Sequence, residues 1–289
     1  MAQLLAELII SSVLLGGLYA MVALGLALIY GVVRMLNLAH GDFLMLAALT
    51  SYLLVRRVGV DATWTLPIIL FSFFLIGVGV ERILIRRVFY KPLTEIGAAS
   101  LLTTLGLSFF LSDAVSGMTR ESEFGLPWFV PPVLLGNISV SSLRLVILLM
   151  ILAFGVGLAL FLRRTLTGMA IRAVMQDRDA TMLMGVNTSM LSTIVFGIST
   201  MLAAIAGWSL VFVTNLHPFV GMSYTIKASI IVILGGMGSI VGAVVGSFIL
   251  SIAETYIGYQ LGTSWSPCIG LLFLLIILIV RPRGLFGHE

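Results

Sequence analysis

The sequence predicts an all-α polytopic membrane protein with about eight to nine membrane segments. Of its 289 residues, 60% are hydrophobic and only 10% are charged, and the mean hydropathy is +1.18. A soluble domain carries about 25% charged residues and could not bury this much apolar surface. Two apolar regions are interrupted by glycine-rich or polar breaks, which predicts two broken or re-entrant helices related as an inverted repeat.

The apolar segments follow one another with short connections. Most of the longer ones approach or exceed the roughly 20 residues that a helix needs to cross hydrocarbon; they are residues 6–33, 64–85, 96–118, 143–162, 190–213, 240–256 and 265–280. Two shorter apolar segments are residues 42–55 and 224–234. We therefore expect residues 1–289 to form a single transmembrane domain.

The first interruption lies between residues 34 and 42 and contains Asn37, His40, Gly41 and Asp42. Polar groups at membrane depth are costly and usually functional, so this cluster is a candidate pathway wall. Backbone amides exposed at the break would be able to bind a substrate carboxylate. The alternative is that these side chains only satisfy backbone groups that the break frees, and this alternative is favoured for His40 alone.

Lysine and arginine indicate the cytoplasmic edges of the spans. Three groups mark such edges: Arg82, Arg86, Arg87 and Lys91; the arginines of residues 163–189; and Arg281 with Arg283. The proline-containing loop 119–142 is expected outside. If residues 6–55 form a V, the N-terminus is also outside, and Arg56 and Arg57 are then external, against the rule.

Residues 96–118 carry neighbouring hydroxyls at Thr103 and Thr104. Such hydroxyls most often bond to carbonyls of their own helix or to a neighbouring helix. A contact with a substrate in transit is the second interpretation.

The central loop, residues 163–189, combines four arginines and two aspartates with interleaved apolar residues. This pattern predicts an amphipathic helix at the cytoplasmic surface. Thr167 is expected to cap its start, and Gly185 with Asn187 to end it. On charge alone, the loop would only fix the orientation of the chain.

The second interruption is the sequence Gly235-Gly236-Met237-Gly238-Ser239. Residues 190–213 leave the cytoplasm and residues 265–280 return to it, so the stretch 224–256 must start and finish outside. Its 33 or so residues are too few for two comfortable crossings of about 20 residues each. We therefore expect a re-entrant or broken hairpin with these glycines at its elbow, and Lys227 and Glu254 on its opposite legs as an intramembrane pair.

Several functional classes are excluded by what the sequence lacks. It has no phosphate-binding loop, no dinucleotide fingerprint, no nucleophile elbow and no HExxH zinc motif. Cys268 is the only cysteine, and the basic residues are scattered instead of forming a nucleic-acid-binding stripe. We expect no catalytic residue, no metal, no cofactor of its own and no nucleic-acid partner.

The order of Asp179, Ala180, Thr181 and Gly185 resembles the EAA loop by which ABC-importer permeases dock onto their ATPase subunits, with Asp and Thr in place of the usual Glu and Ala. Over nearly the whole chain, the sequence resembles LivH-type permeases of branched-chain amino acid ABC importers. The resemblance rests on four stretches of motif residues, within 17–43, 172–187, 227–243 and 281–287.

The resemblance implies a permease subunit of the bacterial cytoplasmic (inner) membrane. Its partners would be a second homologous, LivM-like permease, two ATP-binding subunits and a periplasmic substrate-binding protein. ATP would be bound by the partner subunits, which would dock on Gly168, Arg172, Asp177, Arg178, Asp179, Ala180 and Gly185. The substrate pathway would be formed by Asn37, His40, Gly41, Asp42, Thr103, Thr104, Gly235, Gly236, Gly238 and Ser239.

Other functions remain open at this stage. Members of the same superfamily also transport urea, short-chain amides or simple sugars. An ion-coupled secondary transporter would explain the broken helices but not the amphipathic central loop. A channel would more often show a ring-forming selectivity motif.

Overall fold

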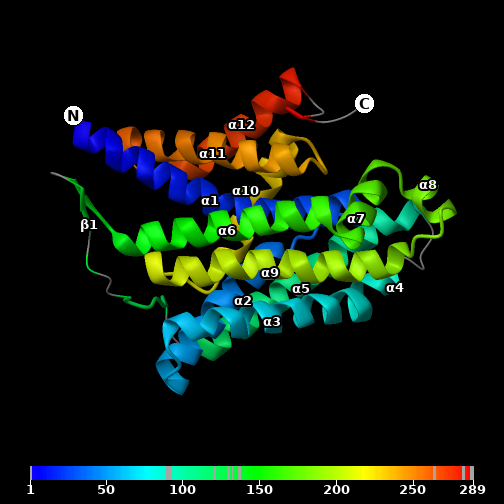
Figure 1. The fold of residues 1–289 in the computed structure, drawn as a ribbon, viewed down its shortest axis with the longest axis horizontal. Helices are drawn as coiled ribbons and strands as arrows, with labels where there is room; N and C mark the ends of the chain where they lie inside the picture. The colour runs from blue at the N-terminus through cyan, green and yellow to red at the C-terminus, as the bar shows by residue number, and fades with distance from the viewer. Residues whose placement is uncertain are drawn as a thin grey trace.

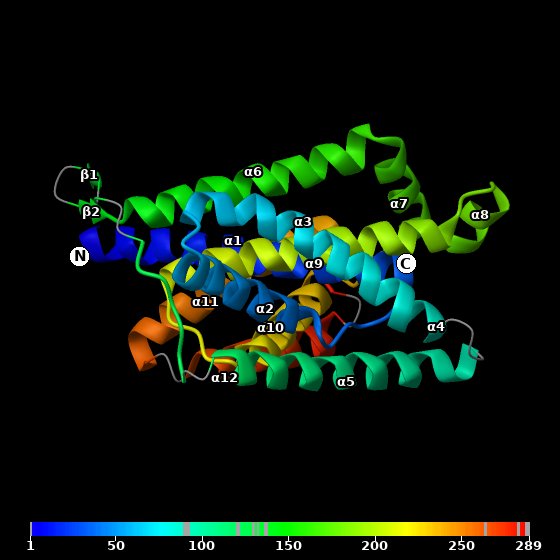
Figure 2. The ribbon, with the colours of Figure 1, turned by 90° about the horizontal axis from the view of Figure 1, so that it is seen from below.

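The computed structural model describes residues 2–88, 93–119, 122–128, 131, 133–135, 138–262, 265–281 and 284–286. Lys91 and Arg283, expected at cytoplasmic edges, lie outside these residues. The described chain is almost entirely helical, and its long helices run along one common axis (Figures 1 and 2). The expected helical class is therefore confirmed.

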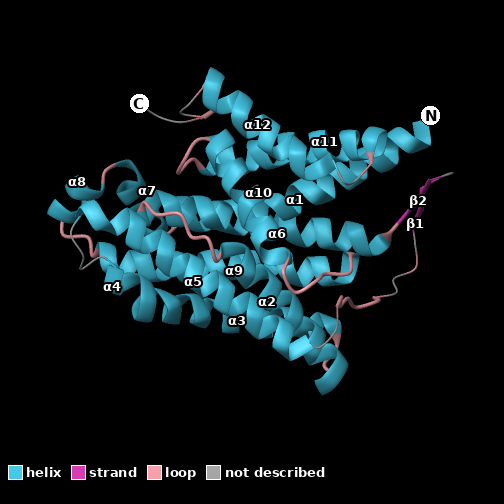
Figure 3. Cartoon of the chain, turned by 180° about the vertical axis from the view of Figure 1, so that it is seen from behind, coloured by secondary structure: helices cyan, strands magenta, loops and turns pink. Residues whose placement is uncertain are grey.

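The first half of the chain contains α1 (Ala2–Val33), α2 (His40–Leu53), the π-helical turn η1 (Leu54–Val58), α3 (Ala62–Val80), the π-helical turn η2 (Glu81–Ile85), α4 (Arg86–Val88) and α5 (Leu93–Thr119). A small antiparallel hairpin, β1 (Val133–Leu135) and β2 (Ile138–Val140), interrupts the following loop. The second half contains α6 (Ser142–Arg164), α7 (Leu166–Gln176), α8 (Arg178–Leu183), α9 (Thr188–Val213), α10 (Val220–Gly235), α11 (Ile240–Leu261) and α12 (Ser266–Val280). In the part of the chain that the structure describes, the regular elements other than this hairpin are helices (Figure 3).

Six helical segments among the described residues are long and apolar enough to cross a membrane: Glu7–Val33, Ala62–Val88, Gly97–Thr119, Ser142–Arg164, Thr188–Val213 and Ile240–Leu261. Helices α10 and α12 are apolar but shorter, and α2 has only 14 residues. The number of eight to nine membrane segments therefore stays a prediction, because six of the described helices have spanning length and the three others are shorter.

The two ends of the bundle differ in charge. Helices α4, α7 and α8 lie together at one end, and the N-terminus and the β1–β2 hairpin lie at the other (Figures 1 and 2). The first end carries Arg82, Arg86, Arg87, Arg163 and Arg164, whereas Arg56 and Arg57 lie toward the other end, so the excess of arginine makes the first end cytoplasmic by the positive-inside rule. The N-terminus is then external, as a V-shaped start predicts.

Helices α1 and α9 form the centre of the bundle. Both are apolar on all sides, and about nine-tenths of each span is buried (89% in each case). Helix α1 packs mainly against α11 and α9, and α9 packs mainly against α2 and α3. Helices α3, α5 and α6 instead expose much of their apolar surface and form the outside of the bundle.

The hairpin formed by α10 and α11 is longer at both ends than the predicted stretch 224–256. Helix α10 begins at Val220, and α11 continues through Tyr256 and Tyr259 to Leu261. With 22 residues, α11 is long enough to cross on its own, whereas α10 has only 16. The predicted stretch ended too early, at residue 256, because tyrosines are tolerated in the interfacial turns of a membrane helix and α11 continues past them.

Glycines allow the central helices to approach closely. A Cβ added to Gly207 on α9 would lie 2.0 Å from the carbonyl oxygen of Leu44 on α2. One added to Gly41 on α2 would lie 2.0 Å from the carbonyl oxygen of Gly221 on α10. Small residues at such crossings supply the van der Waals contact that associates helices in lipid.

We therefore expect Gly207→Ala to destabilise the fold, because overpacking against a backbone carbonyl costs about 1–3 kcal/mol. Gly106→Ala on α5 is the matched control, since an added Cβ there meets no atom within 4 Å. Thermal unfolding in detergent, followed by size-exclusion chromatography, should show a lower melting temperature for G207A only. Equal melting temperatures for the two variants would contradict the close α2–α9 contact.

Candidate functional site

The first break, between α1 and α2, is closed by its own polar side chains. The Asn37 side-chain oxygen accepts a hydrogen bond from the backbone nitrogen of Ala39 at 3.1 Å. His40 is fully buried, and its Nε2 donates to the carbonyl oxygen of Val22 at 2.9 Å. The Asn37 side chain therefore stabilises the break. His40 instead ties the start of α2 to the middle of α1, whose carbonyls the break does not free, so its role stays a prediction.

Gly41 and Asp42 lie where α2 meets α5 and α10. The Gly41 backbone nitrogen donates to Thr225 Oγ1 at 2.8 Å. Ser112 Oγ donates to Asp42 Oδ1 at 3.0 Å. The other Asp42 carboxylate oxygen, Oδ2, has no hydrogen-bond partner among the described residues, although the side chain is completely buried. A buried carboxylate oxygen without a donor is costly and indicates a functional position.

A cavity of about 570 Å³ lies beside Asp42, on the outer half of α5. Its lining contains two serines, a carboxylate and four large apolar side chains: Ser108, Ser112, Asp113, Phe109, Phe110, Phe219 and Met222. Because Ser112 also bonds Asp42, the cavity adjoins the buried cluster. Sequence reasoning missed these residues, although Asp113 is the only charged residue of the predicted span 96–118 and could have indicated them.

Thr103 and Thr104 lie away from this cavity. Each hydroxyl donates to a carbonyl of its own helix, Thr103 to Ala99 at 2.7 Å and Thr104 to Ser100 at 2.9 Å. Thr103 lines a separate hollow of about 370 Å³ beside η2 and α4. These two residues and Asp42 are therefore not brought together in this structure.

The second break has the predicted glycine elbow. Helix α10 ends at Gly235, and Gly236 and Gly238 have φ values of +103° and +84°, which only glycine adopts without strain. Ser239 caps α11 by accepting from the Gly242 nitrogen at 3.0 Å. The C-terminal tail completes the elbow, because the backbone nitrogens of Leu285 and Phe286 donate to the carbonyls of Leu234 and Gly235.

The predicted intramembrane pair between Lys227 and Glu254 is confirmed, with Nζ and Oε2 2.8 Å apart. Tyr19 on α1 donates to the same carboxylate oxygen at 2.6 Å and accepts from Lys227 at 2.5 Å. The three residues join α1, α10 and α11. Pairing of this kind is what allows two charged groups to stay buried at membrane depth.

The central loop forms two helices instead of the single predicted one. Thr165, not Thr167, caps α7, accepting from the Gly168 nitrogen at 2.9 Å. Asp177 breaks the helix because its carboxylate accepts from the nitrogens of Asp179 and Ala180 and starts α8. Gly185, with a φ of +84°, then turns the chain, and Asn187 caps α9 instead of ending the loop helix.

The predicted coupling residues fall into two sets. Asp177, Asp179, Ala180 and Gly185 are exposed at the far cytoplasmic end, and Arg178 is half-buried. Gly168 is buried and lies close to α6, since a Cβ added to it would be 2.2 Å from the carbonyl oxygen of Phe161. Gly168 therefore seats α7 against α6, and Arg172 projects from the same helix.

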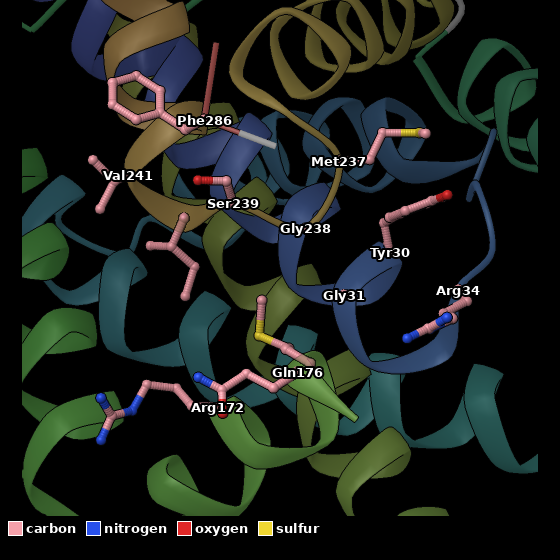
Figure 4. A pocket seen from close by; sticks show the side chains of 12 residues that line it. Tyr30, Gly31, Arg34, Arg172, Gln176, Met237, Gly238, Ser239, Val241 and Phe286 are labelled. Atoms are coloured by element: carbon pink, nitrogen blue, oxygen red, sulfur yellow. The ribbon is translucent and has the colours of Figure 1, made fainter. Parts of the chain in front are cut away.

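Helix α7 meets both breaks at a cavity of about 650 Å³ (Figure 4). Its walls come from the end of α1, from α7, from the elbow and from the tail: Tyr30, Gly31, Arg34, Arg172, Met175, Gln176, Met237, Gly238, Ser239, Ile240, Val241 and Phe286. Met175 packs so closely on α1 that a Cβ added to Gly31 would lie 3.0 Å from its Cγ. The structure thus brings the elbow glycines and the central loop together.

Among the described residues, no group of three or more His, Cys, Asp or Glu side chains is arranged to hold a metal ion. The polar clusters instead consist of paired or hydrogen-bonded side chains around two helix breaks. Such clusters can hold helix ends in place and contact a bound molecule through hydrogen bonds.

Residues 8–281 match the family model described as branched-chain amino acid transport system / permease component. The chain is 30% identical to the high-affinity branched-chain amino acid transport system permease protein LivH of Salmonella typhimurium and to that of Escherichia coli, in both cases over 96% of this chain and 94% of the relative. It is 28% identical to the permease protein BraD of Pseudomonas aeruginosa, over 97% of this chain and 95% of that protein. The chain belongs to the permease family of the branched-chain amino acid transport system.

Proposed function

We propose that this chain is the transmembrane permease subunit of an ATP-driven importer of branched-chain or other hydrophobic amino acids. The observation that carries the proposal is the α7–α8 element, which lies at the cytoplasmic end and whose α7 contacts the end of α1. The similarity to LivH and BraD over nearly the full length supports the same function.

The docking surface for the ATPase subunits is the tip of α8 and the turn after it. It contains the exposed residues Asp177, Asp179, Ala180 and Gly185, together with Arg178. Leu183 and Met184 add to it, because 89% and 86% of these apolar residues are exposed. Apolar residues surrounded by charged ones at a cytoplasmic tip are typical of a protein interface.

Movement of this tip reaches the breaks through α7. Gly168 holds one end of α7 on α6, and Met175 holds the other end on Gly31 of α1. Arg172 lies between these contacts and lines the cavity that the elbow glycines also line. ATP-driven displacement of α8 would therefore shift the end of α1 relative to Gly235, Gly236, Gly238 and Ser239.

The substrate pathway runs past Asp42 and the cavity on α5. A hydrophobic amino acid carries an ammonium group and an apolar side chain, and this cavity offers Asp113 together with Phe109, Phe110, Phe219 and Met222. An ionised carboxylate facing lipid is costly, so Asp113 faces an aqueous path or a partner subunit. Asn37, His40 and Gly41 would hold the chain just before Asp42 in place through their bonds to Ala39, Val22 and Thr225. Thr103 and Thr104 would contact substrate only further along α5.

The architecture is an inverted repeat of two sets of four membrane segments, with α6 between them as a ninth, in a single permease domain, residues 1–289, with the coupling loop at 163–189. The segments α1, α2, α3 and α5 run in directions opposite to those of α9, α10, α11 and α12 (Figures 1 and 2). This pairing relates α2 to α10, and the two cross at Gly41 and Gly221. This repeat does not relate the first break to the glycine elbow, because α1 and α10 run in the same direction and both hairpins open toward the external end (Figure 2).

The complete importer would contain this chain, a second homologous permease, two ATP-binding subunits and a periplasmic substrate-binding protein in the bacterial inner membrane. ATP binding and hydrolysis belong to the ATP-binding subunits in this proposal. An ion-coupled secondary transporter would not need the exposed α8 tip, and the family similarity favours the amino acid importer over urea, amide or sugar transport.

Replacing Leu183 and Met184 together with aspartate is expected to release the ATPase subunits, because the exposed apolar tip would be lost. Co-purification from mild detergent should fall at least about tenfold, equivalent to roughly 1.4 kcal/mol. The control is Val58→Asp with Leu261→Asp, two exposed apolar residues at the external end. Unchanged ATPase recovery from the Leu183 and Met184 variant would reject this docking surface.

Asp113→Asn is expected to lower kcat/KM for leucine uptake by about tenfold or more, because the ammonium group of the substrate loses its counter-ion. Uptake of radiolabelled leucine by cells with the complete transporter measures this. Glu123→Gln, an exposed acid in the external loop, is the control. If the two variants transport equally well, the α5 cavity is not on the pathway.

A further inference from the structure

The cavity between α1, α7 and the elbow has two arginines in its lining, and the proposed transport mechanism does not use their charge. Arg34 follows the last residue of α1, and Arg172 comes from α7. The lining contains no aspartate or glutamate. Within the part of the chain that the structure describes, neither Arg34 nor Arg172 forms a salt bridge with a carboxylate.

The rest of the lining is of mixed polarity. Tyr30, Gln176 and Ser239 provide side chains that form hydrogen bonds, and Figure 4 shows that Gln176 and Arg172 come from the α7 side while Ser239 and Phe286 come from the elbow and the tail. Met237, Val241 and Phe286 are exposed apolar residues (51%, 59% and 41%). The site therefore has an exposed arginine on each side and exposed apolar residues at its surface (Figure 4).

The depth of the cavity suits the headgroup region of the cytoplasmic leaflet. The span Glu7–Val33 has 27 residues, or about 40 Å of helix, which is close to the full thickness of a bilayer with its headgroups. Arg34 follows it directly. Arg172 lies on α7, which follows the cytoplasmic end of the span Ser142–Arg164.

We propose that this cavity binds the phosphate of an anionic phospholipid of the cytoplasmic leaflet. Basic pockets between membrane helices on this side recognise such headgroups, and arginine binds phosphate oxygens with two parallel hydrogen bonds. The acyl chains would lie along Val241 and Phe286, which are on the same side of the elbow (Figure 4). A zwitterionic headgroup or a free amino acid fits less well, because the lining offers no carboxylate for an ammonium group.

The bound lipid would join three moving parts, since the cavity walls are the end of α1, the coupling helix α7 and the elbow before α11. Headgroup binding would then hold these parts in their present arrangement. This inference does not depend on which substrate is transported, and it rests on the proposed function only in that α7, which carries Arg172, is the coupling helix.

The test measures lipid binding to the full chain purified in detergent, by native mass spectrometry and by thermal stabilisation. The probes are phosphatidylglycerol, phosphatidylethanolamine and inorganic phosphate. We expect phosphatidylglycerol to bind at least tenfold more tightly than phosphatidylethanolamine, and inorganic phosphate not to stabilise the protein. Stabilisation by inorganic phosphate equal to that by phosphatidylglycerol would assign the site to a soluble anion and overturn the lipid proposal.

The deciding variant is Arg34→Gln with Arg172→Gln, which should reduce phosphatidylglycerol binding at least tenfold. Its control, Arg163→Gln with Arg164→Gln, removes the same charge from the exposed end of α6, outside the cavity. Arg34→Lys with Arg172→Lys keeps the charge, should retain most of the binding and verifies that substitution at these positions leaves the protein folded. If the glutamine variant and its control lose phosphatidylglycerol binding equally, the lipid is attracted by surface charge in general, and the proposed site is refuted.

Discussion

A helix that breaks inside a membrane must find protein partners for the backbone groups that the break frees, and the core of this protein depends on this constraint. The side-chain oxygens of Asn37, Thr225 and Ser239 accept hydrogen bonds from the backbone nitrogens of Ala39, Gly41 and Gly242, respectively. The backbone nitrogens of Leu285 and Phe286 in the tail donate hydrogen bonds to the last carbonyls of α10. Each partner except Asn37 and Ser239 comes from another segment, so the breaks hold distant parts of the chain together.

The same arrangement connects the cytoplasmic surface to the interior. Helix α7 rests on α6 at Gly168 and on α1 at Gly31, and the elbow lies against the same cavity. The breaks are held by hydrogen bonds and glycine contacts, while the three-residue cluster of Tyr19, Lys227 and Glu254 fixes α10 and α11 on α1 deeper in the bundle. In the proposed mechanism, displacement of α8 would therefore act on the ends of α1 and α10, whose middles are held by this cluster.

Hydropathy predicted most spans to within a few residues, such as 143–162 for Ser142–Arg164, because lipid imposes a length and a polarity that local sequence must meet. The elbow and the Lys227–Glu254 pair were also predictable, since glycine turns and buried charges have few solutions. The division of the central loop at Asp177 was not, because one side-chain cap overrides a continuous amphipathic pattern. The cavity beside Asp113 and the separate position of Thr103 depend on which helix faces pack together, and no single segment encodes that choice.

The most direct test of the account is whether α7 must move against α1 during transport. Cysteines at Gly31 and Met175, in a chain whose Cys268 is replaced by serine, would place a sulfur about where Met175 Cγ lies, 3.0 Å from a Cβ at position 31. This separation suits a disulfide. In the assembled importer, oxidation should abolish leucine uptake while the ATPase subunits stay bound, and a reductant should restore uptake. Full uptake by the cross-linked protein would contradict the account, because α7 would then carry no movement to the core.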